Sequence, residues 1–282
     1  MLLAQPDSGG GWITVPGGNF FSGSSRTQVE KAYQISAAGY GHDRVRQYGW
    51  FDHEAPLQKH DLPEFRIQKV PVTQREYARF VVETGHRAPF VDATTWQSYG
   101  LVHPYKRVRS YNWAGKRPPA DKKNHPVVLV TASDAEAYAV WLSRKTGRKL
   151  RLPYAEEWEK AMRGTDGRLY PWGNDYDASR LNNADQGPFA TMPVGSFPQG
   201  ASPYGVLDGA GQVYEWMATT TQGEQRRVVK GGSWDDHGGV CRPAAWHSRP
   251  QQLKHILIGF RLVEMLPSRS SIRAGGTEGE RL

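Results

Sequence analysis

The sequence has only one cysteine, Cys241, among its 282 residues. A single thiol cannot form an internal disulfide, so the cysteine count gives no indication of an oxidising compartment. The sequence also lacks any run near the roughly 20 apolar residues of a transmembrane helix, and its start, MLLAQPDSGGG, has no basic and apolar stretch typical of a signal peptide. We therefore expect a cytoplasmic protein without a membrane partner.

Long uninterrupted helices are disfavoured as well, because glycine and proline are frequent. The chain has 31 Gly and 19 Pro, which interrupt helices, together with ten Trp. Its formal net charge is +8, with short basic clusters at Lys106 to Arg109 and at Lys122 and Lys123. No nucleic-acid-binding motif accompanies these clusters, so a solvated basic surface is favoured and a nucleic-acid partner is not expected.

Two helices are predicted near residues 74–84 and 134–146. Thr73 and Ser133 each begin an S/T-x-x-E pattern, in which the hydroxyl and the glutamate three residues later satisfy free backbone N–H groups. An apolar stripe follows each pattern and a glycine ends it, which is typical of an amphipathic helix with a defined C-terminus.

A shorter helix is predicted over 155–163, where Glu157 would meet Lys160 one turn later. Residues 24–61 are polar and irregular, which favours a long surface loop. Residues 164–221 are rich in Gly, Pro, Asn and Asp, and so long an irregular span needs bound ions or a dense hydrogen-bond network. An opening strand and turn are predicted over 12–23, and strands at 65–70, 227–229 and 256–265.

Eight segments of the chain, in order, resemble the formylglycine-generating enzyme family, also called the sulfatase-modifying-factor family. They are VPGGNFFSGS, FRIQKVPVTQREYARFV, HPVVLVTASDAEAYAVWL, LRLPYAEEWEKAMRG, LYPWGN, PVGSFPQGASPYGVLDGAGQVYEW, RVVKGGSW and GFRLV. The resemblance implies one α+β domain over 12–266, with a formylglycine-generating-enzyme-like (C-type lectin-like) fold and little regular secondary structure. A flexible N-terminus over 1–11 and a polar, disordered tail over 267–282 would flank it.

The resemblance also implies structural calcium ions that hold the long loops. One family site maps onto VLDGAGQVYEW, where two carboxylates and three backbone carbonyls would supply the oxygen ligands that calcium prefers. A glycine turn with two solvated acids is the alternative. The residues concerned are Asp208, Gly209, Gly211, Val213 and Glu215.

A further family calcium site would use Asn182 in RLNNAD, with Asp185 nearby. The chain is shorter here than the vertebrate-type pattern of the family, so the ligand set is less complete. This second site is a prediction from resemblance alone.

Copper chemistry is disfavoured by the loop GGSWDDHGGVC, residues 231–241. Copper-dependent members of the family have two cysteines five residues apart after GGS, which hold Cu(I). Aligned on GGS, the second cysteine falls on Cys241 but the first falls on Asp236. A carboxylate is a hard ligand and cannot replace a thiolate on Cu(I). We therefore expect neither copper nor oxidation of cysteine to formylglycine, and the identity of any other redox metal stays open.

The same loop and the residues after it are the predicted site, a groove formed by residues 234–257. Aromatic walls with a few convergent polar groups suit a peptide, protein or small-molecule ligand. A polar surface loop is the alternative, as is a buried Cys241 with no chemical role. The predicted catalytic residues are Asp236, His237, Cys241 and Arg242. The predicted ligand-binding residues are Trp234, Asp235, Trp246 and His247.

Another polar stretch, DHEAPLQKH, contains His53, Glu54 and His60. Neighbouring residues on an extended chain point in opposite directions, so His53 and Glu54 would not act together. A solvated segment that leads into the strand at Phe65 is the favoured interpretation.

Two functions stay open, and the sequence does not decide whether the protein is an enzyme. One is an oxidoreductase or maturation factor that acts on a peptide or small molecule without the two-cysteine copper site. The alternative is a non-catalytic ligand-binding protein of C-type lectin fold, such as a variable protein of a diversity-generating retroelement. In those proteins the variable residues lie between GGSW and GFR, and here residues 235–257 depart from the family pattern.

Overall fold

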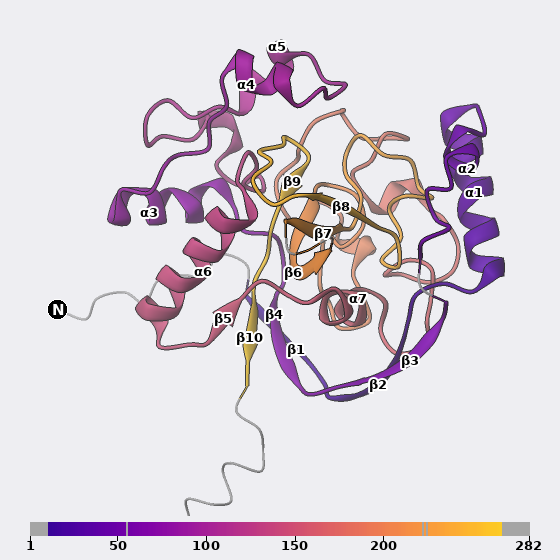
Figure 1. Ribbon diagram of the computed structural model, residues 1–282. Coiled ribbons are helices and arrows are strands. Elements are labelled where there is room, and N and C mark those ends of the chain that lie inside the picture. The colour runs from indigo at the N-terminus through magenta and orange to yellow at the C-terminus, as the bar shows by residue number, and fades with distance from the viewer. Residues whose placement is uncertain (1–10, 55, 222, 224, 267–282) are drawn as a thin grey trace, which may run out of the picture.

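Several small β-sheets form the framework of the chain (Figure 1). The computed structural model describes residues 11–54, 56–221, 223 and 225–266. The predicted flexible N-terminus, apart from Gly11, and the predicted disordered tail lie outside these residues. The strands are β1 (Trp12–Val15), β2 (Gly18–Ser22), β3 (Gln58–Leu62), β4 (Phe65–Gln68), β5 (Leu150–Arg151), β6 (Tyr214–Thr221), β7 (Arg226–Lys230), β8 (Trp246–Pro250), β9 (Ile258–Gly259) and β10 (Val263–Met265).

One sheet combines strands from distant parts of the chain, whereas another is built from four consecutive strands. One sheet has the order β1–β4–β10–β5, and a second has the order β8–β7–β6–β9. β2 and β3 form a separate antiparallel pair. The predicted strand over 256–265 is wrong as a single element, because the chain leaves β9 in one sheet, buries Phe260 to Leu262, and enters β10 in the other.

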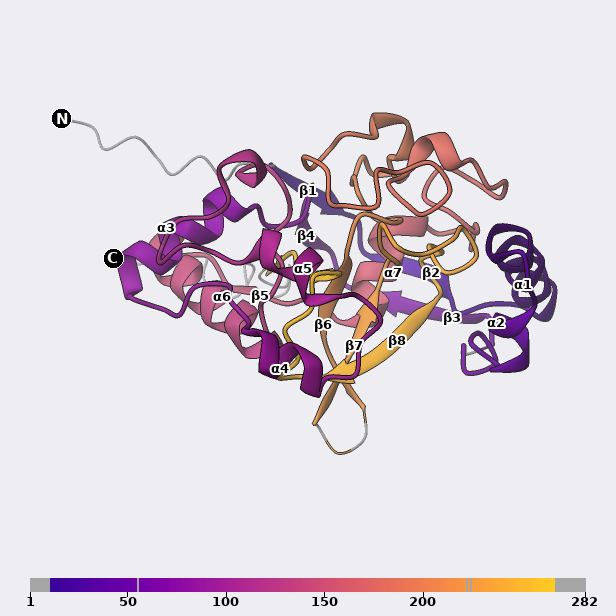
Figure 2. The same ribbon diagram turned by 90° about the horizontal axis from the view of Figure 1, so that it is seen from above.

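Most helices lie around these sheets, at the periphery of the molecule, whereas the helix over Ala155–Arg163 lies among the sheets and is buried from Glu157 to Arg163 (Figure 2). None of the described helices combines the length and the apolar character needed to cross a bilayer. The α-helices are α1 (Arg26–Tyr40), α2 (Arg44–Gln47), α3 (Gln74–Thr84), α4 (Ala93–Ser98), α5 (Tyr105–Val108), α6 (Ala132–Thr146) and α7 (Ala155–Arg163).

Three of these helices follow the sequence patterns. α3 begins after Thr73, whose side chain and that of Glu76 form the predicted reciprocal cap. α6 is confirmed as a helix, but it begins earlier, because Thr131 rather than Ser133 is its N-cap. α7 has the predicted bounds, while the expected contact of Glu157 with Lys160 is wrong, since Glu157 pairs with Arg151.

The prediction of a surface loop over 24–61 is wrong. This part of the chain forms the 15-residue helix α1, then α2 and β3. α1 buries only Ala32, Tyr33 and Ser36, so its sequence carries little apolar periodicity. The available signal was the cap, since Ser25 and Gln28 bond each other's backbone N–H groups.

The predicted irregular span 164–221 is confirmed only as far as 213, because Tyr214–Thr221 is strand β6. Hydrogen bonds and a buried ion pair hold the irregular part. Among the described residues this span contains only short 3-10 turns and isolated bridges. Arg261 donates to the carbonyls of Leu207 and Asp208 and pairs with Glu215, whose side chain is fully buried like its own. One cation thus connects the loop before β6 with the loop before β10.

Candidate functional site

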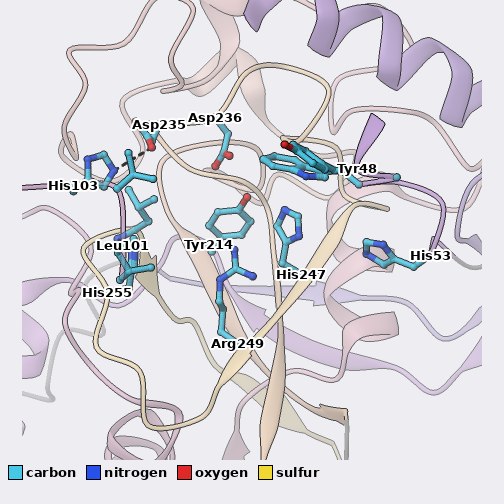
Figure 3. A pocket seen from close by; sticks show the side chains of 14 residues that line it. Tyr48, His53, Leu101, His103, Tyr214, Asp235, Asp236, His247, Arg249 and His255 are labelled. Carbon is cyan, nitrogen blue, oxygen red and sulfur yellow. Dashed lines mark hydrogen bonds and ion pairs between the residues drawn. The ribbon is translucent and has the colours of Figure 1, made fainter. Parts of the chain in front are cut away.

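A cavity of about 470 Å³ opens between residues 48–53, residues 101–103 and the face of β8 (Figure 3). We call it the histidine pocket, because four histidines line it together with two aspartates and Arg249. Figure 3 shows Tyr214 between Asp236 and Arg249. The histidines and aspartates are His53, His103, His247, His255, Asp235 and Asp236.

Asp236 is the carboxylate at the centre of the pocket. It accepts a hydrogen bond of 2.6 Å from the Ser233 hydroxyl, and its backbone N–H donates to the Ser233 carbonyl. Loss of surrounding water raises the pKa of Asp236 to about 6, and the nearby charge of Asp235 adds to the increase. The carboxyl can therefore hold or release a proton close to neutral pH.

Tyr214 lies beside this carboxyl and contributes a hydroxyl. Its side chain is hydrogen-bonded to Asp236, which opposes the increase in the pKa of that carboxyl. Burial raises the pKa of Tyr214 well above its usual range, so the phenol stays protonated at neutral pH. Tyr214 is thus a permanent donor next to a carboxyl that titrates.

Two histidines of the pocket, His247 and His255, are held as neutral rings. Burial lowers the pKa of His247 and that of His255 to about 3. The Nδ1 atom of His255 accepts from the Leu257 N–H at 3.0 Å, so its proton is on Nε2. The Nε2 atom of His53 donates to the Trp246 carbonyl at 3.0 Å. Fixed tautomers of this kind give the pocket a defined set of donors and acceptors.

His103 and Asp235 face each other at the opposite side of the pocket. The Nε2 atom of His103 is 3.1 Å from Oδ2 of Asp235, yet the two atoms lack the alignment of a hydrogen bond. Among the residues with assigned positions, no three His, Cys, Asp or Glu side chains converge as a metal site.

The structure brings together three of the predicted site residues, namely Asp235, Asp236 and His247. The other wall residues were missed because they come from separate parts of the chain. Residues 48–53 belong to the segment expected to be a loop, and 101–103 precede α5. Tyr48, Trp50 and His53 within six residues were a usable signal, since aromatic and imidazole side chains commonly line pockets.

Cys241 and Arg242 do not line the pocket, and their predicted place in an accessible groove is wrong. Both side chains are fully buried. Burial raises the pKa of the Cys241 thiol well above its usual range, so it is held as a thiol. Arg242 pairs with Glu54, and neither side chain of that pair is exposed. The prediction that Glu54 is solvated is therefore wrong as well, whereas His53 is exposed at the pocket rim.

Trp234 and Trp246 lie in different surroundings, one in a hydrophobic cluster and the other beside a second cavity. Trp234 is 0% exposed and packs with Val213 and Ile256, so its predicted place in an open groove is wrong. Trp246 is half-buried and lines a separate cavity of about 220 Å³. It still reaches His53, with the ring centroids 4.4 Å apart.

His237 contacts a neighbouring loop rather than the pocket. Its Nδ1 atom is 2.5 Å from Oδ1 of Asp185, and its ring lies edge-on to Tyr40. Asp185 also accepts from Tyr176 and Asn183. The carboxylate is thus occupied by protein donors.

The predicted calcium ligands fit a cation only in part. Both oxygens of Glu215 accept from Arg261, and one also accepts from Trp158, so the charge of Glu215 is neutralised within the protein. Asp208 accepts from the Gly195 N–H, and burial raises its pKa to about 6. This arrangement does not fit a site in which Asp208 and Glu215 chelate one ion.

The calcium site predicted at Asn182 has one suitable ligand atom. Oδ1 of Asn182 is buried and has no hydrogen-bond donor among the described residues. Its Nδ2 donates to Ala190 and Gln212, which orients Oδ1 away from them. An orphaned buried carbonyl oxygen fits a calcium ligand, while Asp185 is engaged elsewhere.

The Asp236→Asn substitution is expected to change how stability depends on pH. A folded-state pKa above its ordinary value favours folding at low pH, and the contribution is lost as pH rises through about 6. As the pH rises from about 4 to about 7.5, the free energy of unfolding of the wild type should therefore fall by about 1–3 kcal/mol relative to that of Asp236→Asn. Urea unfolding of both proteins at the two pH values measures the difference, and parallel pH profiles would contradict it.

Comparison with known proteins identifies the family of the chain. The family model described as "Sulfatase-modifying factor enzyme 1-like domain" matches residues 3–266. Hercynine oxygenase of Mycolicibacterium smegmatis is 30% identical over 92% of this chain, and the chain spans 62% of that protein. The formylglycine-generating enzyme of Streptomyces coelicolor is 29% identical, over 92% of this chain and 90% of its own length.

Solved structures show the same fold at lower identity. PvdO from Pseudomonas aeruginosa has a TM-score of 0.68 and 23% identity, covering 90% of this chain and 94% of its own. Treponema denticola variable protein 1 has a TM-score of 0.60 and 16% identity, with the same coverages of 90% and 94%. These likenesses confirm the predicted α+β fold.

Proposed function

The chain belongs to the sulfatase-modifying-factor family, and from this premise we propose that it is an oxidoreductase or maturation factor. It acts on a peptide or small molecule bound in the histidine pocket, and it does so without a two-cysteine copper site. The observation that carries the proposal is Asp236, a carboxyl with a pKa of about 6 inside a cavity of about 470 Å³. Groups that titrate near neutrality in a cleft are the usual carriers of acid–base chemistry.

The pocket residues divide into three roles. Asp236 accepts or returns a proton, and the protonated Tyr214 donates a hydrogen bond to a developing negative charge beside it. Arg249, the only lysine or arginine among the lining residues, binds an anionic group of the ligand. Tyr48 and Trp50 provide aromatic surface at the mouth, and Tyr48 is 72% exposed.

Copper chemistry of the formylglycine type does not fit the donors. The chain has one cysteine, and its thiol is buried and protonated. Two thiolates are needed to hold Cu(I), and Asp236 cannot supply the second. With copper added, the protein is expected not to convert the cysteine of a CxPxR peptide to formylglycine. Mass spectrometry of the peptide checks this, and product formation by the wild type would overturn this half of the proposal.

The activity itself is tested with extracts of small molecules and peptides. Wild type, Asp236→Asn and the surface control Asp166→Asn are incubated with the same extract, and mass spectrometry follows consumption and binding. A compound consumed by the wild type and the control but only bound by Asp236→Asn supports the proposal. A compound bound by all three and consumed by none contradicts catalysis.

That second outcome would favour the alternative, a ligand-binding protein without catalysis. Its supporting observation is that six of the 14 lining residues come from the segment 235–257, which departs from the family pattern. Variation confined to this segment would alter the pocket wall and leave the rest of the fold in place. These residues are Asp235, Asp236, His247, Arg249, His255 and Leu257.

Structural calcium remains part of the proposal, at Asn182 rather than at Glu215. An ion bound only by the folded protein stabilises it by about 2.7 kcal/mol at a hundredfold excess over its Kd. Calcium added to chelator-treated protein is therefore expected to raise Tm by several degrees, and Asn182→Ala should abolish the response. An identical Tm with and without calcium in the wild type would exclude the site.

A further inference from the structure

The excess positive charge of the chain is concentrated in one segment, residues 101–125. The segment has seven lysines and arginines against one acidic residue, Asp121, and so carries +6 of the formal net charge of +8. It contains α5, a tight turn at Ala114 to Arg117 and two 3-10 turns, Arg109–Tyr111 and Ala120–Lys122. Its exposed cations are Lys106, Arg107, Arg109, Lys116, Arg117 and Lys123.

The fold does not neutralise these charges. Nineteen ion pairs join described side chains, and only two of them involve the segment. These are Lys122 with Asp121 and His103 with Asp235. None of the six exposed cations therefore has a carboxylate partner among the described residues. Arg107 contacts the Trp234 ring instead. An uncompensated patch of one sign repels itself and attracts molecules of the opposite charge.

The patch adjoins the histidine pocket. Leu101, Val102 and His103, at the start of the same segment, form one wall of that cavity. Val102 is 96% exposed and Phe90 is 50% exposed, so apolar surface lies beside the cations. α4 and α5 lie together at one edge of the molecule (Figure 1). A partner held by the segment would therefore have direct access to the mouth of the pocket.

We propose that residues 101–125 dock an acidic segment of a partner protein, which thereby lies at the mouth of the histidine pocket. That the docked segment presents a substrate to the pocket rests on the proposed function, whereas the docking itself does not. A single-stranded nucleic acid bound along this patch would stack its bases on exposed aromatic side chains. Tyr111 and Trp113 are buried, and Tyr105 donates its hydroxyl to the Val91 carbonyl, so the exposed apolar group within the segment is the aliphatic Val102.

The test measures binding of a fluorescein-labelled peptide of about ten glutamates by anisotropy. The patch variant is Lys106→Glu with Lys116→Glu. The control is Lys59→Glu with Lys149→Glu, which changes the same residue type to the same extent at two exposed positions outside the segment. Circular dichroism establishes that both variants fold, and a single-stranded DNA of similar charge is measured in parallel.

The patch variant should bind the peptide about tenfold more weakly than the wild type, with the control within about twofold, and added salt should weaken binding. Equal losses in both variants, or no binding by the wild type, would overturn the proposal. DNA bound more tightly than the peptide, with the same dependence on the patch, would replace the protein partner with a nucleic acid. Asp236→Asn should bind the peptide as the wild type does. The pocket variant therefore tests the proposed activity, and the patch variant tests the docking independently.

Discussion

Replacing Glu215 by alanine is expected to lower the free energy of unfolding by about 3–5 kcal/mol, because it leaves a buried guanidinium without its counter-charge. Arg261 donates to Glu215 at 2.7 Å through both Nε and Nη2, and neither side chain is exposed. Trp158 would also lose its acceptor, at 2.8 Å. Urea unfolding followed by circular dichroism measures the change.

Two controls define the origin of this loss. Glu30→Ala removes the partner of Arg46 in an exposed ion pair and should leave stability nearly unchanged. The conservative variant Glu215→Gln removes only the charge and keeps an acceptor oxygen for Trp158 and Arg261. A Glu215→Gln protein as stable as the wild type would show that the unpaired charge is not the cause.

The second large effect is expected for Glu54→Ala, again about 3–5 kcal/mol in the free energy of unfolding. Glu54 pairs with Arg242 and accepts from the Ser24 hydroxyl, and both charged side chains are inaccessible to solvent. The pair fixes residues 48–54 against the loop after Cys241. Its loss should therefore also loosen α2, so that trypsin cleaves faster after the exposed Arg44 and Arg46.

Stability and proteolysis distinguish this substitution from an ordinary surface change. Glu83→Ala, which breaks the exposed pair with Lys145, is the matched control and should show little change in either measurement. A Glu54→Ala protein that unfolds like the wild type and resists trypsin equally would show that the pair does not hold this wall of the pocket.

Local sequence patterns predicted some helices well and others not at all. The cap at Thr73 and the sequence pattern of α7 involve residues close together in the chain. Such local patterns predict a helix reliably where the apolar stripe is strong. α1 has the same kind of cap but buries little, so its composition looked like that of a loop. A weak stripe is common in a helix that covers a core only along one edge.

The pocket could not be found from sequence because its walls meet only in the folded chain. Asp235 and Asp236 were identified from a motif, but Tyr214, Arg249 and His103 belong to other elements. Burial was also misjudged, since an arginine and a tryptophan next to a polar motif suggest an open groove. Arg242 is instead matched by Glu54 across 188 positions of the chain, a partner that local spacing cannot reveal.

Strand β8 alternates between two cavities, and this has a practical use. His247 and Arg249 face the histidine pocket, while Trp246 faces the smaller cavity on the other side. The main chain of β8 is fixed by its antiparallel register with β7, from Trp246 opposite Lys230 to Pro250 opposite Arg226. A combinatorial library at positions 247 and 249 would therefore alter the chemistry of the pocket while the backbone pairing persists, which makes this strand a suitable starting point for engineering new binders.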